Sequence, residues 1–154
     1  MALEIERKFL LTSDAWRGLG PSTAYRQGYL STVKERTVRV RVAGDQGTIT
    51  IKGITRGAIR TEFEYSIPLA DANAMLDELC EKPLVEKTRH VVEVDGTTWE
   101  IDEFAGVNSG LIIAEVELDS VDQEITHPEW VGAEVTDDPR YFNANLIAHP
   151  YSEW

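Results

Sequence analysis

Apolar and polar residues alternate with a period of two along most of this 154-residue chain, which is the pattern of β-strands with one buried face. Eight segments carry the pattern: residues 3–11, 25–33, 37–43, 48–52, 61–67, 86–94, 97–104 and 111–119. Most are separated by short turns, and Asp95-Gly96 is a strong hairpin signal. Because short connections join strands that run in opposite directions, the sequence predicts a largely antiparallel sheet.

A few helices are expected beside the strands. Residues 71–82 form the best candidate, because apolar side chains recur there at helical spacing and Pro83 ends the pattern. The expected apolar stripe consists of Ala72, Met75, Leu76, Leu79 and Cys80. A short final helix is expected to begin near Pro139 and run through Leu146. The chain is therefore predicted to have an α+β fold in which strands dominate.

Length and charge limit the classes of protein that this chain can belong to. A chain of 154 residues suits one domain, expected to span 1–154, and the net charge of −12 disfavours binding to nucleic acid or to anionic membranes. Cys80 is the single cysteine, which excludes a disulfide scaffold. The charged N-terminus lacks a signal-peptide pattern, and no apolar run is long enough to span a bilayer. We expect a soluble, cytoplasmic protein.

The polar faces of the expected strands carry paired charges. Residues two apart in a strand share a face, so the two charges of each pair point to the same side of their strand. Six such pairs are more than we expect from strand faces that simply meet solvent. Like charges side by side are destabilising unless something bridges them. Carboxylate pairs favour a divalent cation, and basic pairs favour an oxyanion. The charged positions are Glu4, Glu6, Lys8, Arg39, Arg41, Lys52, Glu62, Glu64, Lys87, Arg89, Asp102, Glu115 and Glu117.

A closed eight-stranded barrel would bring these faces together around a lumen wide enough for one small ligand. With all of the paired charges inside, the lumen would hold six bases and seven acids, a net charge of −1. One or two divalent cations would make the lumen positive. That charge suits a polyphosphate, which carries roughly four or five negative charges near neutral pH because terminal phosphates titrate near pH 6.

The order of these motifs resembles the CYTH superfamily, also called the triphosphate tunnel metalloenzymes. The chain begins with Glu4-Ile5-Glu6-Arg7-Lys8, which is similar to the Glu-x-Glu-x-Lys signature of that family. The later matches come in the order of the family: Arg39-x-Arg41, Thr50-x-Lys52, Glu62-x-Glu64, Lys87-x-Arg89, Asp102 and Glu115-x-Glu117. The short length, with Gln27-Gly28-Tyr29-Leu30 and Asp138-Pro139-Arg140-Tyr141, resembles the compact bacterial inorganic triphosphatases.

The resemblance implies an antiparallel eight-stranded tunnel that hydrolyses inorganic triphosphate to pyrophosphate and phosphate with Mg²⁺ or Mn²⁺. Substrate would bind Lys8, Arg39, Arg41, Lys52, Lys87 and Arg89. The cation would bind Glu4, Glu6, Asp102, Glu115 and Glu117, while Glu62 and Glu64 would support the basic residues. Lys8 and Tyr29 are expected to form a pair that handles a proton.

Other functions remain open at this level. The same tunnel serves class IV adenylyl cyclases and thiamine or nucleoside triphosphatases, and the sequence does not rank their substrates. A non-catalytic polyphosphate-binding module is less favoured, because binding an anion alone does not require seven lumen carboxylates. The sequence also allows a homodimer and does not choose between the two metals.

Overall fold

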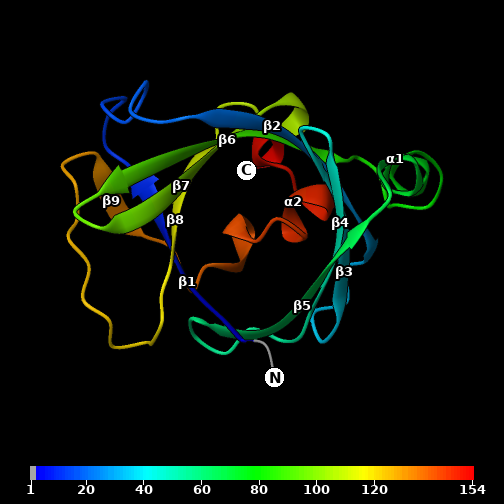
Figure 1. Ribbon diagram of the computed structural model, residues 1–154, viewed down its shortest axis with the longest axis horizontal. Helices are drawn as coiled ribbons and strands as arrows, with labels where there is room; N and C mark the ends of the chain where they lie inside the picture. Colours follow the sequence, from blue (N-terminus) through cyan, green and yellow to red (C-terminus); the bar gives the residue numbers. More distant parts are fainter. Residues whose placement is uncertain (1–2) are drawn as a thin grey trace.

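The computed structural model describes residues 3–154, and its dominant element is a closed antiparallel barrel (Figure 1). The strands are β1 (Leu3–Leu11), β2 (Ser22–Ser31), β3 (Thr37–Ala43), β4 (Gln46–Lys52), β5 (Ile59–Ile67), β6 (Val85–Val94), β7 (Thr97–Phe104), β8 (Ile112–Glu117) and β9 (Val131–Glu134). The helices are α1 (Leu69–Glu78) and α2 (Asn145–Ala148), with one-turn 3-10 helices at Gly106–Asn108, Pro139–Tyr141 and Tyr151–Glu153. No helix among residues 3–154 has the length and apolar character needed to cross a membrane.

The barrel closes because β1 has partners on both sides. The strand order is β5-β4-β3-β2-β6-β7-β8-β1, and the start of β1 pairs with β5 through Leu3 and Thr61. Eight strands thus form the ring, which confirms the predicted eight-stranded antiparallel barrel. The second half of β1 also pairs with β9, where Phe9 lies opposite Glu134. The sequence analysis missed β9, because its four residues are too short to show alternation.

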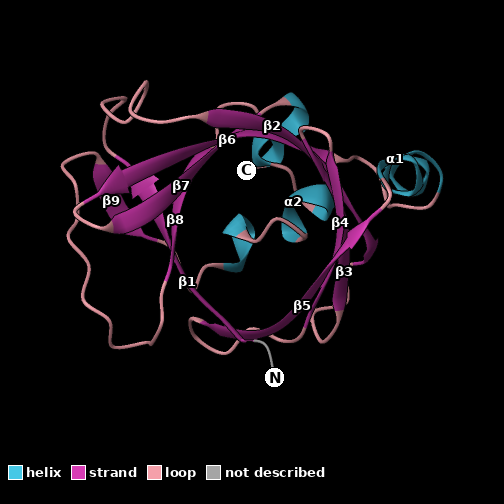
Figure 2. Cartoon of the chain, viewed as in Figure 1, coloured by secondary structure: helices cyan, strands magenta, loops and turns pink. Residues whose placement is uncertain are grey.

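Two apolar clusters cover the outside of the barrel, and one of them lies under helix α1, which is outside the ring of strands (Figure 2). The first joins Phe9, Trp99 and Ile101 on the strands to Trp16 and Trp130 from the connecting segments. In the second cluster, Ala72 and Leu76 of α1, together with Cys80 just after the helix, pack against β3 and β4. Odd-numbered residues of β1 and β7 therefore face outward, which leaves the even-numbered, charged residues to face the lumen.

Helix α1 is shorter than predicted. The prediction of 71–82 placed Leu79 in the buried stripe, but the helix ends at Glu78 and Leu79 is 66% exposed. The amides of Leu79 and Cys80 both donate to the carbonyl of Met75, which stops the regular ladder and rotates Leu79 outward. Cys80 stays buried, as the sequence predicted.

The chain after β9 enters one end of the barrel (Figure 1). Leu146 and Ile147 of α2, together with Tyr141, pack against Tyr29, Phe104 and other inward residues of the strands. The single C-terminal helix expected from Pro139 to Leu146 is instead a 3-10 turn followed by the short α2. The apolar cluster fills one end of the lumen and leaves the charged part as a separate cavity.

Candidate active site

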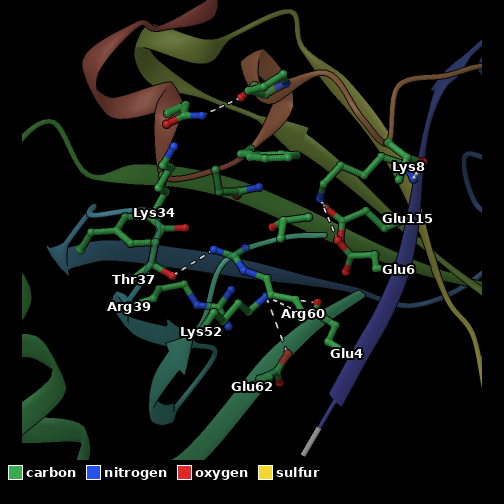
Figure 3. A pocket seen from close by; sticks show the side chains of 18 of the residues that line it. Glu4, Glu6, Lys8, Lys34, Thr37, Arg39, Lys52, Arg60, Glu62 and Glu115 are labelled. Atoms are coloured by element: carbon green, nitrogen blue, oxygen red, sulfur yellow. Dashed lines mark hydrogen bonds and ion pairs between the residues drawn. The ribbon is translucent and has the colours of Figure 1, made fainter. Parts of the chain in front are cut away.

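The charged part of the lumen is a cavity of about 860 Å³ (Figure 3), a size typical of small-molecule sites. Its lining includes eight basic and seven acidic side chains. Twelve of the thirteen charged positions singled out in the sequence line it: Glu4, Glu6, Lys8, Arg39, Arg41, Lys52, Glu62, Glu64, Lys87, Arg89, Glu115 and Glu117. Tyr29 lines it as well, and Asp102 lies outside the lining. Alternation along the strands therefore brings distant charges together as predicted.

One side of the cavity is crowded with positive charge. We call the set Arg39, Arg41, Lys87 and Arg89 the basic wall. Burial, together with the charges of Arg39 and Arg89, lowers the pKa of Arg41 to about 10. Among the described residues, Arg39 Nε is buried with no hydrogen-bond partner. A buried donor without a partner is costly, so the basic wall is suited to an anion that accepts from it.

Tyr25 and Asp102 hold the basic wall in place. The guanidinium groups of Arg41 and Arg89 lie over the Tyr25 ring, with their central carbons 4.6 and 4.9 Å from its centroid. The carboxylate of Asp102 is fully buried, and it accepts from Lys87 Nζ at 2.7 Å and from Arg89 Nε at 2.8 Å. Both carboxylate oxygens of Asp102 are thereby occupied.

The pKa values of the buried pair reflect this contact. Burial alone would raise the pKa of Asp102, but Lys87 and Arg89 lower it to about 2. Burial is also the largest influence on Lys87, and with the charges of Arg89 and Arg41 it lowers the pKa of Lys87 to about 7 despite Asp102. In this structure Asp102 is thus the counter-ion of Lys87 and Arg89. The cation-ligand role expected from the sequence stays a prediction.

The neighbouring part of the cavity wall, on β7, β8 and β1, is crowded with negative charge and meets the basic wall where Arg89 contacts Glu100 at 2.9 Å. We call Glu6, Glu100, Glu115 and Glu117 the acidic wall. In the strand register, Glu6 lies opposite Glu117 and Glu100 lies opposite Glu115. Directly opposed like charges destabilise a sheet. Burial and the neighbouring carboxylates raise the pKa values of Glu117 and Glu100 above the usual range. An added cation would relieve this repulsion.

Lys8 provides part of that cationic charge. Its ammonium donates to Glu6 and to Glu115, each at 2.8 Å, so it bridges two carboxylates as a cation would (Figure 3). Burial alone would lower the pKa of Lys8, but Glu115 and Glu6 raise it above the ordinary value. Within residues 3–154, no three acidic, His or Cys side chains form a ready-made metal site. Glu6 and Glu115 instead accept from Lys8, and Glu100 accepts from Arg89. Carboxylates grouped in this way suit a hard divalent cation.

Tyr29 does not hydrogen-bond to Lys8 in the described part of the chain. Both hydrogen bonds made by the Lys8 ammonium go to carboxylates. Tyr29 belongs to the apolar cluster that fills the end of the barrel and is 5% exposed. The structure therefore brings both residues to one cavity, and their pairing to handle a proton stays a prediction.

The remaining predicted residues form a third group near the start of β1. Lys52 Nζ lies 2.8 Å from Glu4 and 3.7 Å from Glu62. Glu64 accepts from the Thr50 hydroxyl, which in turn accepts from Arg39. Glu62 and Glu64 therefore lie beside Lys52 and Thr50, and their supporting role stays a prediction.

Several cavity residues were missed by the sequence analysis. Glu100 and Arg60 could have been found, because each lies two positions from a predicted residue on the same strand face. Arg60 donates to the carbonyl of Gly53 and to the Thr37 hydroxyl. Lys34 and Asn143 come from connecting segments, where no periodicity marks a side chain as inward.

Comparisons with known proteins agree with this geometry. The model of the CYTH domain family matches residues 2–151. The chain is 48% identical to an inorganic triphosphatase of Acetivibrio thermocellus, covering 100% of this chain and 99% of the relative. It is 40% identical to an inorganic triphosphatase of Nitrosomonas europaea, covering 93% and 95%. The crystal structure of the inorganic triphosphatase NE1496 superimposes with a TM-score of 0.69 at 36% identity, covering 96% of this chain and 95% of that one.

Proposed function

The chain belongs to the CYTH domain family, and we propose that it hydrolyses inorganic triphosphate to pyrophosphate and phosphate inside its tunnel, with the help of a divalent cation. The two relatives above, which span the chain almost completely, carry that activity in their names. The observation that carries the proposal is the division of one cavity into a crowded basic wall and a crowded acidic wall. A polyanion and a cation bound together would relieve the repulsion in both.

We assign substrate binding to the basic wall together with Lys8 and Lys52. Each guanidinium can donate to two phosphate oxygens at once, which fixes the orientation of a phosphate as well as its position. The unpartnered Nε of Arg39 gives one such donor without breaking a protein contact. Most of the catalysis expected from the chain itself is electrostatic, because phosphoryl transfer spreads charge over oxygens that these donors can stabilise.

We assign Mg²⁺ or Mn²⁺ to the acidic side, where Glu4, Glu6, Glu115 and Glu117 would hold it and Glu100 adds a fifth carboxylate. When bound, such a cation neutralises phosphate charge and lowers the pKa of a bound water. Asp102 is assigned a positioning role, because Lys87 and Arg89 occupy both of its oxygens.

Lys8 is assigned as a charged group that binds phosphate. In the ligand-free protein, Glu115 and Glu6 raise the pKa of Lys8 and favour its protonated form. Its two contacts, to Glu6 and Glu115, place a positive charge within the acidic wall. Tyr29 is assigned to the wall of the cavity beside the apolar cluster.

We further propose that the protein works in the cytoplasm as one domain over residues 1–154. A reducing compartment fits its lone free cysteine, which is buried. Light scattering on the purified protein would distinguish a monomer from the homodimer that the sequence allows.

A substrate panel tests the proposed function. Purified protein is incubated with inorganic triphosphate, thiamine triphosphate or ATP, each with Mg²⁺, Mn²⁺ or excess EDTA, and products are followed by phosphorus NMR. We expect equal amounts of phosphate and pyrophosphate from inorganic triphosphate, only with a metal. Cyclic AMP and pyrophosphate from ATP would indicate a cyclase instead. Binding of triphosphate without any product would indicate a non-catalytic module.

A further inference from the structure

Asn143 lies in the C-terminal segment that enters the barrel, just before α2, and its side chain joins two members of the basic wall. Its carbonyl oxygen Oδ1 accepts from Lys87 Nζ at 2.9 Å and from Gln27 Nε2 at 3.1 Å. The buried Gln27 in turn accepts from Arg41 Nε at 3.0 Å. Lys87 and Arg41 are thus linked through two amide side chains that lie 116 positions apart in the chain.

The chemistry of the partners fixes the orientation of both amides. Lys87 can only donate, so the atom of Asn143 that faces it must be the oxygen. The Nε of Arg41 can only donate as well, so Gln27 presents its oxygen there and its nitrogen to Asn143. The amide nitrogen Nδ2 of Asn143 is consequently left for another acceptor. It has no hydrogen-bond partner in residues 3–154, it is not among their buried unpaired atoms, and Asn143 lines the cavity.

We propose that Asn143 binds the substrate directly, donating from Nδ2 to a phosphate oxygen while its carbonyl oxygen holds Lys87 and Gln27 in place. The inference rests on the proposed function and adds a neutral residue to its charged site. Lys87 has three ammonium hydrogens, of which Asp102 and Asn143 take two. The third is free for the same phosphate group.

A neutral amide suits this position better than a carboxylate. Asn143 supports two cationic side chains, yet it adds no negative charge beside a polyanion. A carboxylate of the same shape would keep the contacts to Lys87 and Gln27 but would turn an oxygen toward the phosphate. Replacing Asn143 by Asp therefore keeps the contacts that support Lys87 and Gln27 and removes only the proposed contact with substrate.

Three variants test the proposal: Asn143→Asp, Asn143→Ala and the control Asn108→Ala. The Asn108 side-chain oxygen accepts from the Tyr151 amide at 2.8 Å, so Asn108 holds the same C-terminal segment, but it does not line the cavity and bonds to neither Lys87 nor Gln27. For each protein we would measure KM and kcat for inorganic triphosphate with Mg²⁺, the dissociation constant for triphosphate by calorimetry with Ca²⁺, and the melting temperature without ligand.

Asn143→Ala should weaken triphosphate binding about 10- to 100-fold, the range for a hydrogen bond to a charged group. Asn143→Asp should weaken it at least as much and yet melt at the wild-type temperature or above, because its carboxylate pairs with Lys87. Asn108→Ala should bind triphosphate as the wild type does, even if it melts at a lower temperature. If Asn143 only supported the fold, triphosphate affinity would fall only in variants whose melting temperature also falls.

Three results would overturn the inference. The first two are an Asn143→Asp or an Asn143→Ala protein that binds triphosphate like the wild type. The third is an equal loss of binding in Asn143→Ala and Asn108→Ala, since that would reflect damage to the C-terminal segment. A wild-type protein that binds triphosphate but releases no phosphate from it would refute the proposed hydrolase, and the calorimetry would still report on Asn143.

Discussion

Replacing Asp102 by Asn should destabilise the protein without ligand, and the structure gives the size of the effect. The buried carboxylate neutralises Lys87 and Arg89 through three contacts of 2.7, 2.8 and 2.9 Å. An amide of the same shape would leave the buried Lys87 without its counter-ion and Arg89 with Glu100 alone in hydrogen-bond contact, and it would turn an NH₂ group toward a donor. Breaking a buried ion pair in this way costs about 3–5 kcal/mol. At about 2–4 °C per kcal/mol for this chain length, the melting temperature should fall by about 6–20 °C.

The assay is thermal and urea unfolding in EDTA, with Glu100→Gln as the matched control. Glu100 lies on the same strand face and bonds to Arg89 at 2.9 Å, but its pKa is raised, so losing its charge should not destabilise the fold. The Asp102 pKa of about 2 lies below the unfolded value near 4. Its contribution is therefore present above pH 4 and lost as the pH falls toward 2, so the variant and the wild type should converge there. An Asp102→Asn protein with wild-type stability but weaker metal binding would refute the counter-ion role and restore the ligand role.

Further predictions concern the two walls and the metal. Glu117→Gln should raise the stability of the ligand-free protein by about 0.2–1 kcal/mol, because it removes a repelling charge, and should abolish most activity; unfolding curves and phosphate release check the two effects. Arg39→Ala should weaken triphosphate binding by about 1.5–3 kcal/mol in calorimetry, whereas Arg7→Ala, which breaks an outward pair with Glu134, should leave it unchanged; equal losses would mean that the faces of the barrel are wrongly assigned. Phosphate release should stop in excess EDTA and return with Mg²⁺ or Mn²⁺, and full activity in EDTA would contradict a metal-dependent reaction.

The barrel and most of its lumen could be predicted from the sequence, because a period of two assigns side chains to faces without any knowledge of packing. Glu4, Glu6 and Lys8 share one face of β1 for this reason alone, and they all line the cavity. Short turns then ordered the strands, so that an eight-stranded ring followed from local signals.

The parts that were missed depend on contacts between distant segments. Asp102 has the residue type and position of a cation ligand, and only the register that sets it opposite Arg89 shows that its oxygens are taken. Asn143 reaches Gln27 across the fold from a segment without periodicity. Strand β9 forms because β1 offers it a free edge near Phe9 and Leu11, which four residues of sequence do not reveal.

A thermal scan with both ligands tests most directly whether a cation and triphosphate share this lumen. The protein is melted without ligand, with Ca²⁺ alone, with triphosphate alone and with both, using Ca²⁺ to limit hydrolysis. A ligand present at 100 times its dissociation constant should add about 2.7 kcal/mol to the free energy of unfolding. Because each ligand cancels charge that the other would feel, the stabilisation by both should exceed the sum of the separate effects. Stabilisations that only add, or no shift with triphosphate, would contradict a shared site.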